Sequence, residues 1–365
     1  MKIPLYKPYI SNNEVSAVSR VFKSGKLSRG VEIELFEKEF ASYVGKKYAI
    51  AVNSGTSGLH ILVRTLGWKK GDEVITTPFS YVASANALLF EGVTPIFIDI
   101  DSRTLNIDAN KIEEKITPKT KGMLLVHILG LPVNYQEIKQ LKDKYNLQVI
   151  EDACEAIGKP NDNFIVTKLG EATVYGFHEN KQLTTGGEGG MIVTDDPIIA
   201  QKCLAMRDQG RSLKKDWMKY VILGFNFRMT EMQAAFGREQ LKIIDKMLTR
   251  REEIAQRYSN LLNNVRGVVI PDQTTKDKRS WFVYFILLEN NENRDRVYKA
   301  LLGNGIASST NYFPPIYNFP MYADYTNGCE ITDKIFERIL ALPMFYEMTN
   351  DEVEQVSKIV KDVLK

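Results

Sequence analysis

The fold is decided by residues 172–190, which read ATVYGFHENKQLTTGGEGG. The segment opens with an apolar run, Ala172–Phe177, passes through Lys181, and ends in residues 186–190, which hold four glycines among five residues. A nearly continuous apolar run is typical of a strand that is buried on both faces. Glycines let the backbone approach a bound group closely. We therefore predict a covered sheet whose edge presents Lys181 on a glycine-rich loop.

Other apolar runs of this kind predict further strands, at Tyr48–Val52, Glu73–Thr76, Thr94–Ile98, Met123–His127, Gln148–Glu151 and Met191–Thr194. Amphipathic patterns between them predict helices, such as Thr56–Leu66, Ser80–Phe90 and Tyr135–Tyr145. Because strands and helices alternate along the chain, we expect an α/β fold with a mostly parallel, seven-stranded sheet covered by helices on both faces.

The pattern changes after about Arg228. A long helix is expected from Thr230 to about Leu261, followed by elements of a smaller α/β unit: a strand at Trp281–Leu288, a helix at Arg294–Leu302, a loop at Asn311–Asn318 and a helix at Asp351–Leu364. We predict a large domain with an N-terminal arm at residues 1–245 and a small C-terminal domain at residues 246–365.

Length and composition narrow the class of protein. The 365 residues favour two domains, and 44% hydrophobic with 25% charged residues is typical of a globular protein. A net charge of only +3 does not suggest a nucleic-acid partner. No apolar run approaches the roughly 20 residues of a membrane span, and the N-terminus lacks an apolar signal core. We expect a soluble, cytoplasmic protein.

The cysteine and histidine content argues against a metal centre. The only cysteines are Cys154, Cys203 and Cys329, and they are widely spaced in a chain that has only three histidines. Neither a disulfide framework nor a Cys/His zinc cluster is expected from so few, scattered residues. We predict no metal.

A turn of small residues follows the strand at Tyr48–Val52. Residues 53–58 read Asn-Ser-Gly-Thr-Ser-Gly and open a helix. Free N–H groups and the positive end of the helix dipole make such a turn a possible phosphate site, and Thr56 and Ser57 add hydroxyl donors. The alternative is an ordinary helix cap, because serine and threonine are favoured there in any case.

Two acids end the strand at Gln148–Glu151. Glu151 and Asp152 should lie at the carboxyl edge of the sheet, where open α/β folds bind ligands. Asp152 could hold a positive charge there, either a metal or a protonated ring nitrogen. A solvated strand end or a helix cap is the structural alternative.

Lys181 is the most specific candidate. A lysine desolvated among glycines can become the neutral amine that a Schiff-base nucleophile needs. The alternatives are that Lys181 is an ordinary surface lysine and that the nearby His178 is a hydrogen-bonded structural residue. Together, a phosphate turn, a carboxylate and a lysine suggest pyridoxal phosphate, which requires all three.

The chain resembles the DegT-type (DegT/DnrJ/StrS) nucleotide-sugar aminotransferases over essentially its full length. The matching motifs are Gly25–Gly30, the Asn-Ser-Gly-Thr-Ser turn, Thr77–Ala83, Val126-His127, Glu151–Glu155, Phe177–Gly190 and Gly224–Ala235. The resemblance implies the aspartate-aminotransferase fold (fold type I of pyridoxal-phosphate enzymes), with the cofactor on the large domain. It also implies a homodimer whose two active sites lie at the interface.

Roles for individual residues follow from the same resemblance. Lys181 is the expected Schiff-base lysine, and Asp152 is expected to pair with the pyridine nitrogen. The other expected cofactor contacts are Glu155 near the ring hydroxyl, Tyr81 stacked on the ring, Gly55, Thr56 and Ser57 at the phosphate, and Asn226 reaching the phosphate from the partner subunit. Arg228, Tyr312 and Phe313 are the expected lining of the sugar-nucleotide cleft.

Two positions depart from the family pattern. Many relatives carry a serine where this chain has Gly176, so one phosphate contact is expected to be missing. The run Thr185–Gly190 is one glycine longer than usual, which puts the register of that loop in doubt. Neither departure touches Lys181, and an intact lysine disfavours the dehydrase chemistry of relatives that have lost it.

The expected activity is transfer of an amino group from an amino acid, L-glutamate in most relatives, to a keto-sugar nucleotide. The motifs around residues 53–57 and Tyr81 favour C4 of a 4-keto-6-deoxy sugar, in polysaccharide or glycan biosynthesis. The alternatives are amination at C3, a cyclitol substrate, and a regulatory protein that binds the cofactor without turnover. Intact Lys181 and Asp152 argue against the last of these.

Overall fold

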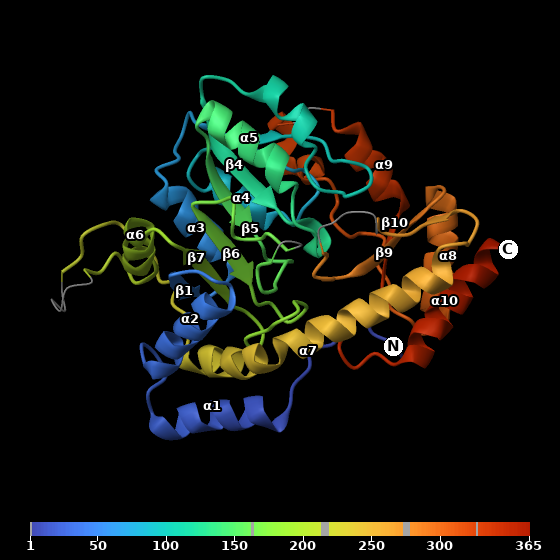
Figure 1. The fold of residues 1–365 in the computed structure, drawn as a ribbon, viewed down its shortest axis with the longest axis horizontal. Helices are drawn as coiled ribbons and strands as arrows, with labels where there is room; N and C mark the ends of the chain where they lie inside the picture. The colour runs from blue at the N-terminus through green and yellow to red at the C-terminus, as the bar shows by residue number, and fades with distance from the viewer. Residues whose placement is uncertain (1, 162–163, 213–218, 273–277, 326–327) are drawn as a thin grey trace.

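The computed structural model describes residues 2–365 except 162–163, 213–218, 273–277 and 326–327. Two β-sheets organise the described part of the chain. A seven-stranded sheet lies within the first 200 residues, a three-stranded sheet lies near the C-terminus, and one long helix, α7 (Glu231–Leu262), runs past both (Figure 1). This is the predicted α/β architecture, with the small sheet in the predicted C-terminal part.

The large sheet has the strand order β1-β7-β6-β5-β4-β2-β3. Its strands are β1 (Tyr48–Val52), β2 (Glu73–Thr76), β3 (Thr94–Phe97), β4 (Thr120–Val126), β5 (Gln148–Asp152), β6 (Ala172–Gly176) and β7 (Gly190–Thr194). All neighbours pair in parallel except β7, which is antiparallel to both β1 and β6. The prediction of a mostly parallel sheet is therefore confirmed.

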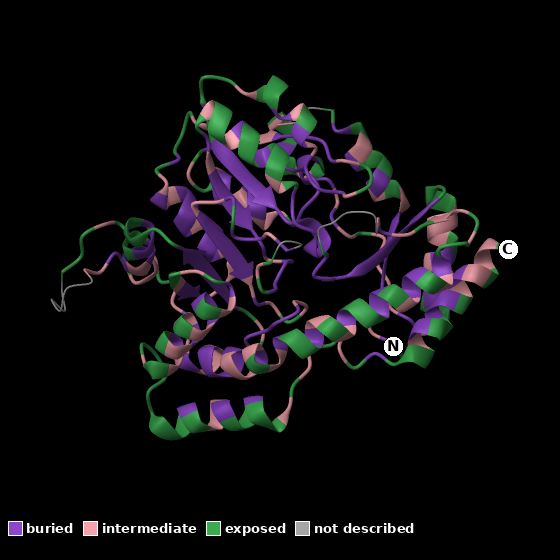
Figure 2. Ribbon diagram, in the orientation of Figure 1, coloured by how far each residue is buried: buried purple, intermediate pink, exposed green. Residues whose placement is uncertain are grey.

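Helices cover both faces of this sheet, and its strands are almost entirely buried (Figure 2). One face packs against α3 (Gly55–Thr65), α4 (Ala83–Leu89) and α6 (Pro197–Arg207). The other face packs against α2 (Val31–Tyr43), α5 (Tyr135–Tyr145) and the first half of α7. Neighbouring residues of β1 show the division, because Ile50 faces the first layer and Ala51 the second. Burial on both faces explains the continuous apolar runs.

The small sheet is antiparallel and has the order β10-β9-β8. Its strands are β8 (Val268–Val269), β9 (Tyr284–Leu288) and β10 (Ile339–Leu342), and its helices are α8 (Asn291–Gly303), α9 (Glu330–Arg338) and α10 (Asn350–Leu364). The N-terminal arm joins this unit, since Ile3 packs in its core, and α1 (Asn12–Ser24) then packs against α7. Among the described residues, none of the helices is both long and apolar enough to cross a bilayer.

Helix α7 begins where the sequence predicts, because Thr230 and Gln233 form a capping box. The helix is continuous across residues 245 and 246, so the domain boundary placed there stays a prediction. Short 3-10 helices complete the chain, at Ala109–Lys111, Glu113–Lys115, Ile128–Gly130, Ile316–Asn318 and Pro320–Tyr325.

Two predicted elements start later than expected. The strand predicted from Trp281 begins at Tyr284. Trp281 has a φ of 26°, and Ser280 donates to the carbonyl oxygens of Gly130 and Ile157, in loops between strands of the large sheet, instead of pairing with a strand. The helix predicted from Ser80 begins at Ala83, because the chain bends at residues 78–80 before it enters the helix.

Candidate active site

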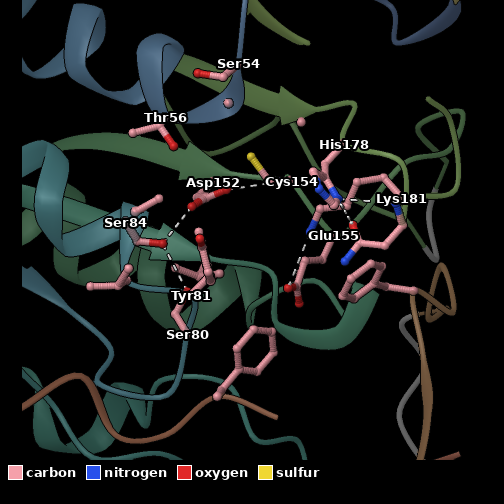
Figure 3. Close-up of a pocket in the computed structure, with 18 of the residues that line it drawn as sticks. Ser54, Thr56, Ser80, Tyr81, Ser84, Asp152, Cys154, Glu155, His178 and Lys181 are labelled. Atoms are coloured by element: carbon pink, nitrogen blue, oxygen red, sulfur yellow. Dashed lines mark hydrogen bonds and ion pairs between the residues drawn. The ribbon is translucent and has the colours of Figure 1, made fainter. Parts of the chain in front are cut away.

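A cavity of about 720 Å³ lies at the carboxyl ends of β5 and β6, opposite the start of α3 (Figure 3). Its walls come from both halves of the chain. Of the residues predicted from the sequence, it brings together Gly55, Thr56, Tyr81, Asp152, Glu155, Lys181, Tyr312 and Phe313.

The N-terminus of α3 forms one end of the cavity. Ser54 is the N-cap, and its Oγ accepts from the N–H of Ser57 at 3.1 Å. Gly55 and Thr56 are the first two helical residues, so their N–H groups have no acceptor within the helix. They line the cavity together with the Ser54 side chain. The helix is therefore both capped and open to an anion, which fits a phosphate group.

Asp152 is fixed at the end of β5. Its Oδ2 accepts from the Oγ of Ser84 at 2.8 Å, and its Oδ1 accepts from the N–H of Cys154 at 3.1 Å (Figure 3). The side chain is 4% exposed and lines the cavity. A buried carboxylate needs a compensating partner, and a protonated ring nitrogen in the cavity would supply one.

Glu151 has a different role, because adjacent strand residues point to opposite faces. Its carboxylate is completely buried and hydrogen-bonds to Nε2 of His127 at 2.9 Å and to the N–H groups of Leu169 and Gly170. Burial alone would raise its pKa, but the hydrogen bond to His127 and the backbone N–H donors bring the pKa below its ordinary value. Of the two acids that end β5, only Asp152 faces the cavity.

Lys181 lies on the loop between β6 and β7 and is no ordinary surface lysine, since its side chain is 15% exposed. Its Nζ is 3.8 Å from Oε1 of Glu155 and 4.0 Å from the ring centroid of Phe282. The amine is therefore held between a carboxyl group and an aromatic face at the cavity wall (Figure 3). His178 also lines the cavity, and its Nδ1 pairs with Oδ1 of Asn180 at 3.0 Å.

Glu155 is 4% exposed, and its Oε2 accepts from the N–H of Leu129 at 2.8 Å. Burial raises the pKa of Glu155 to about 7, against the lowering influence of Lys181. Near neutral pH the carboxyl group is therefore protonated in some molecules and ionised in the others. This suits a residue that is expected to lie near the ring hydroxyl of pyridoxal phosphate.

Three predicted residues lie outside the cavity lining. Ser57 is buried behind the turn, where its Oγ is 2.9 Å from that of Ser54. Asn226 is exposed, and Arg228 donates to Oδ1 of Asp208. The structure does not bring these residues into the cavity of their own chain.

Sequence reasoning missed several residues that shape the site. Ser84 contacts Asp152, and Phe282 contacts Lys181. Each comes from another element that is distant in sequence, so no local motif indicates it. Tyr81, which was predicted, is 65% exposed at the cavity and leaves an aromatic face available for stacking.

The longer glycine run is accommodated within its own loop. Gly186 and Gly187 have φ values of 82° and 131°, a region that favours glycine. The strand β7 then begins at Gly190, which pairs with Gly176. The position of Lys181 is therefore compatible with the extra glycine.

These residues fit pyridoxal phosphate: an open helix N-terminus for the phosphate, a buried carboxylate for the ring nitrogen and a lysine for the aldehyde, all on one cavity. Within the described part of the chain, no group of three or more His, Cys, Asp or Glu side chains is placed to hold a metal ion. Fold and site together define a pyridoxal-phosphate-dependent enzyme with the aminotransferase fold.

Comparison with known proteins identifies the family of pyridoxal-phosphate enzymes to which the chain belongs. Residues 8–361 match the DegT/DnrJ/EryC1/StrS aminotransferase family, and the chain belongs to this family. GDP-perosamine synthase of Escherichia coli O157:H7 is 34% identical, over 99% of this chain and 98% of the relative. The protein is thus a pyridoxal-phosphate-dependent sugar aminotransferase.

Solved structures agree with this assignment. PseC of Helicobacter pylori, an aminotransferase involved in the biosynthesis of pseudoaminic acid, is 30% identical and has a TM-score of 0.94 over 99% of each chain. NtdA of Bacillus subtilis, solved with bound cofactor PMP, is 32% identical and has a TM-score of 0.90 over 97% of this chain and 83% of that one.

Proposed function

We propose that this protein transfers the amino group of L-glutamate to C4 of a 4-keto-6-deoxy sugar carried on a nucleotide, for polysaccharide or glycan biosynthesis in the cytoplasm. The observation that supports it most directly is that Lys181, Asp152 and the N-terminus of α3 share one cavity. The same cavity is also lined by the aromatic side chains of Tyr312 and Phe313, the expected lining of the sugar cleft. A name such as GDP-perosamine synthase, for a relative of nearly equal length, favours a nucleotide-linked sugar.

The cofactor, once bound, supplies an electron sink that weakens the Cα–H bond of the donor. The chain's own residues do the rest. Asp152 holds the positive charge of the ring nitrogen, and Ser84 keeps its carboxylate oriented. Lys181 would accept the proton from the donor's Cα and return it to the bound cofactor. Because the amino acid and the sugar use one site in turn, we expect ping-pong kinetics.

We also propose that the active enzyme is a homodimer with shared sites. Asn226 and Arg228 lie outside the cavity of their own chain, on a segment that carries the exposed side chains of Val221 and Leu223. A second copy of the chain could cover these apolar side chains and receive Asn226 at its phosphate site.

The first test is the visible absorbance of the purified protein with pyridoxal phosphate, before and after L-glutamate. We expect a lysine-dependent band that glutamate removes, and no such band in Lys181→Ala. Lys334→Ala is the matched control, because Lys334 has a side chain that is 70% exposed. A wild-type protein without the band would favour the binding-only alternative, and a band that glutamate leaves unchanged would exclude glutamate as donor.

The sugar position needs a separate test. Matched 3-keto and 4-keto nucleotide sugars are offered to the enzyme, and NMR of the product locates the new amino group. Turnover of the 3-keto sugar alone would overturn the C4 proposal and leave the aminotransferase intact.

A further inference from the structure

Cys154 occupies a central position in the cavity that the proposed mechanism does not use. It lies between Asp152 and Glu155 in sequence and lines the cavity, whereas Cys203 and Cys329 are buried elsewhere. Its N–H donates to Oδ1 of Asp152 at 3.1 Å. Burial raises the pKa of the Cys154 thiol well above its ordinary value, so the group stays a protonated thiol and is a poor nucleophile.

The sulfur of Cys154 fills the space between two glycines from different elements. A Cβ atom placed on Gly55, the first residue of α3, would lie 2.7 Å from Sγ. A Cβ atom placed on Gly176, the last residue of β6, would lie 3.1 Å from Sγ and 3.2 Å from the Cβ of Cys154. Neither glycine has the positive φ that would by itself require glycine. Close packing against Cys154 is therefore the constraint that these two positions share.

We propose that Cys154 is a positioning residue of the cofactor site, and that its sulfur sets the separation between the phosphate-binding end of α3 and the strand that leads to Lys181. The backbone N–H of the same residue donates to Asp152. Cys154 therefore contacts the phosphate turn at Gly55, the carboxylate expected at the ring nitrogen, and the end of the strand that leads to Lys181. The sulfur also takes up the space beside Gly176, which accounts for the absence of a side chain there. The inference rests on the cofactor placement proposed above.

A double-mutant cycle tests this role on the apoenzyme. The variants are Gly55→Ala, Cys154→Ala and the combination of both, and the measurements are the Kd of pyridoxal phosphate, the Kd of pyridoxal and the melting temperature. The added Cβ of Gly55→Ala should displace α3 and raise the Kd of pyridoxal phosphate by about tenfold or more. Once the sulfur is removed, the next nearest atoms to that Cβ are Cα and N of Gly176, at 3.4 Å and 3.8 Å, which are ordinary contact distances. The double variant should therefore return to within about threefold of wild type.

Pyridoxal lacks the phosphate, so it reports whether the phosphate end is affected. We expect the ratio of the pyridoxal Kd to the pyridoxal phosphate Kd to fall in Gly55→Ala and to recover in the double variant.

Gly58→Ala is the matched control on the same helix, because its Cβ would meet Val174 at 2.9 Å and not Cys154. Cys154→Ala should not rescue it. Cys154→Ser retains most of the side-chain volume, and should bind pyridoxal phosphate like wild type.

Three outcomes would overturn the inference: a harmless Gly55→Ala, additive effects in the double variant, or equal losses for pyridoxal phosphate and pyridoxal. If Gly55→Ala does not fold, recovery of folding in the double variant supports the inference, and failure of both counts against it. A wild-type protein that binds the two ligands equally would instead refute the proposed cofactor placement.

Discussion

The carboxylate of Asp152 depends on a serine that no sequence motif indicates. Ser84→Ala removes the donor to Oδ2, and a hydrogen bond to a charged group contributes roughly 1.5–3 kcal/mol. We expect the rate of half-reaction with glutamate, followed by absorbance in single turnovers, to fall about tenfold or more. The control is Ser80→Ala, because the Ser80 hydroxyl contacts Ser84 and not Asp152. Equal losses in the two variants would show that Ser84 acts only through packing.

Glu155 should make the stability of the apoenzyme depend on pH. Its neighbouring charged groups are Lys181, Asp152 and Arg279, and burial raises the pKa of Glu155 from 4.5 to about 7. Between these values the folded protein keeps a proton that the unfolded chain releases. The free energy of unfolding should therefore fall as pH rises through this window, by up to about 3 kcal/mol.

Glu155→Gln has a similar shape but does not titrate. In urea unfolding of the apoenzymes, the variant should gain stability relative to wild type on going from pH 5 to pH 8. Parallel pH profiles for the two proteins would mean that Glu155 keeps an ordinary pKa in the folded state.

At the scale of elements, the side-chain amide of Gln182 joins the segment before β9 to the loop that carries Lys181. Nε2 of Gln182 donates to the carbonyl oxygens of Glu155 at 2.6 Å and Ser280 at 2.8 Å. Gln182→Ala leaves both buried acceptors without this donor, so we expect the free energy of unfolding to fall by about 2–3 kcal/mol.

The same substitution should lower the rate with glutamate, because Phe282 follows the released segment and contacts Lys181. Urea unfolding and single-turnover kinetics measure the two effects. Gln256→Ala is the control, since within the described residues the Gln256 amide bonds only to Asn260, on the exposed side of α7, and the substitution should change neither. A stable but inactive Gln182→Ala would place the amide in the chemistry rather than in the packing.

The elements that the sequence predicts well are those whose burial is uniform. The strands of the large sheet match within a few residues, because helices cover both of its faces and most strand positions are therefore apolar. Helix α1 was not predicted; it buries only Glu14, Ala17 and Val21 and leaves Val15 and Phe22 exposed. The late start of β9 was also beyond prediction, because it depends on the long-range hydrogen bonds of Ser280.

The residues of the site also divide into those that a local sequence motif predicts and those that depend on long-range contacts. Lys181, Asp152 and the turn at Gly55 stand in local motifs whose chemistry is recognisable, and the structure brings them to one cavity. Ser84, Phe282 and Gln182 act through contacts between residues 27 to 101 positions apart in the chain, which only the folded topology creates. Sequence therefore predicts the candidate reacting groups, and the structure adds the residues that contact them.

At the scale of the whole molecule, the open question is whether one chain completes a site. Asn226 is exposed and outside the cavity of its own chain. If it serves the partner's phosphate site, Lys181→Ala and Asn226→Ala should complement each other. A mixed dimer would contain one site that lacks both residues and one that is intact.

Co-expression of the two variants in equal amounts, with a different affinity tag on each, gives this mixed dimer. Random pairing makes half of the dimers mixed, so the unfractionated mixture should recover about a quarter of the wild-type activity, while each variant alone stays low. The purified mixed dimer should recover about half. Should Asn226 act within its own chain, every site in the mixture would lack one residue, and no activity would return. The measurement therefore decides between a site built by one chain and a site built by two.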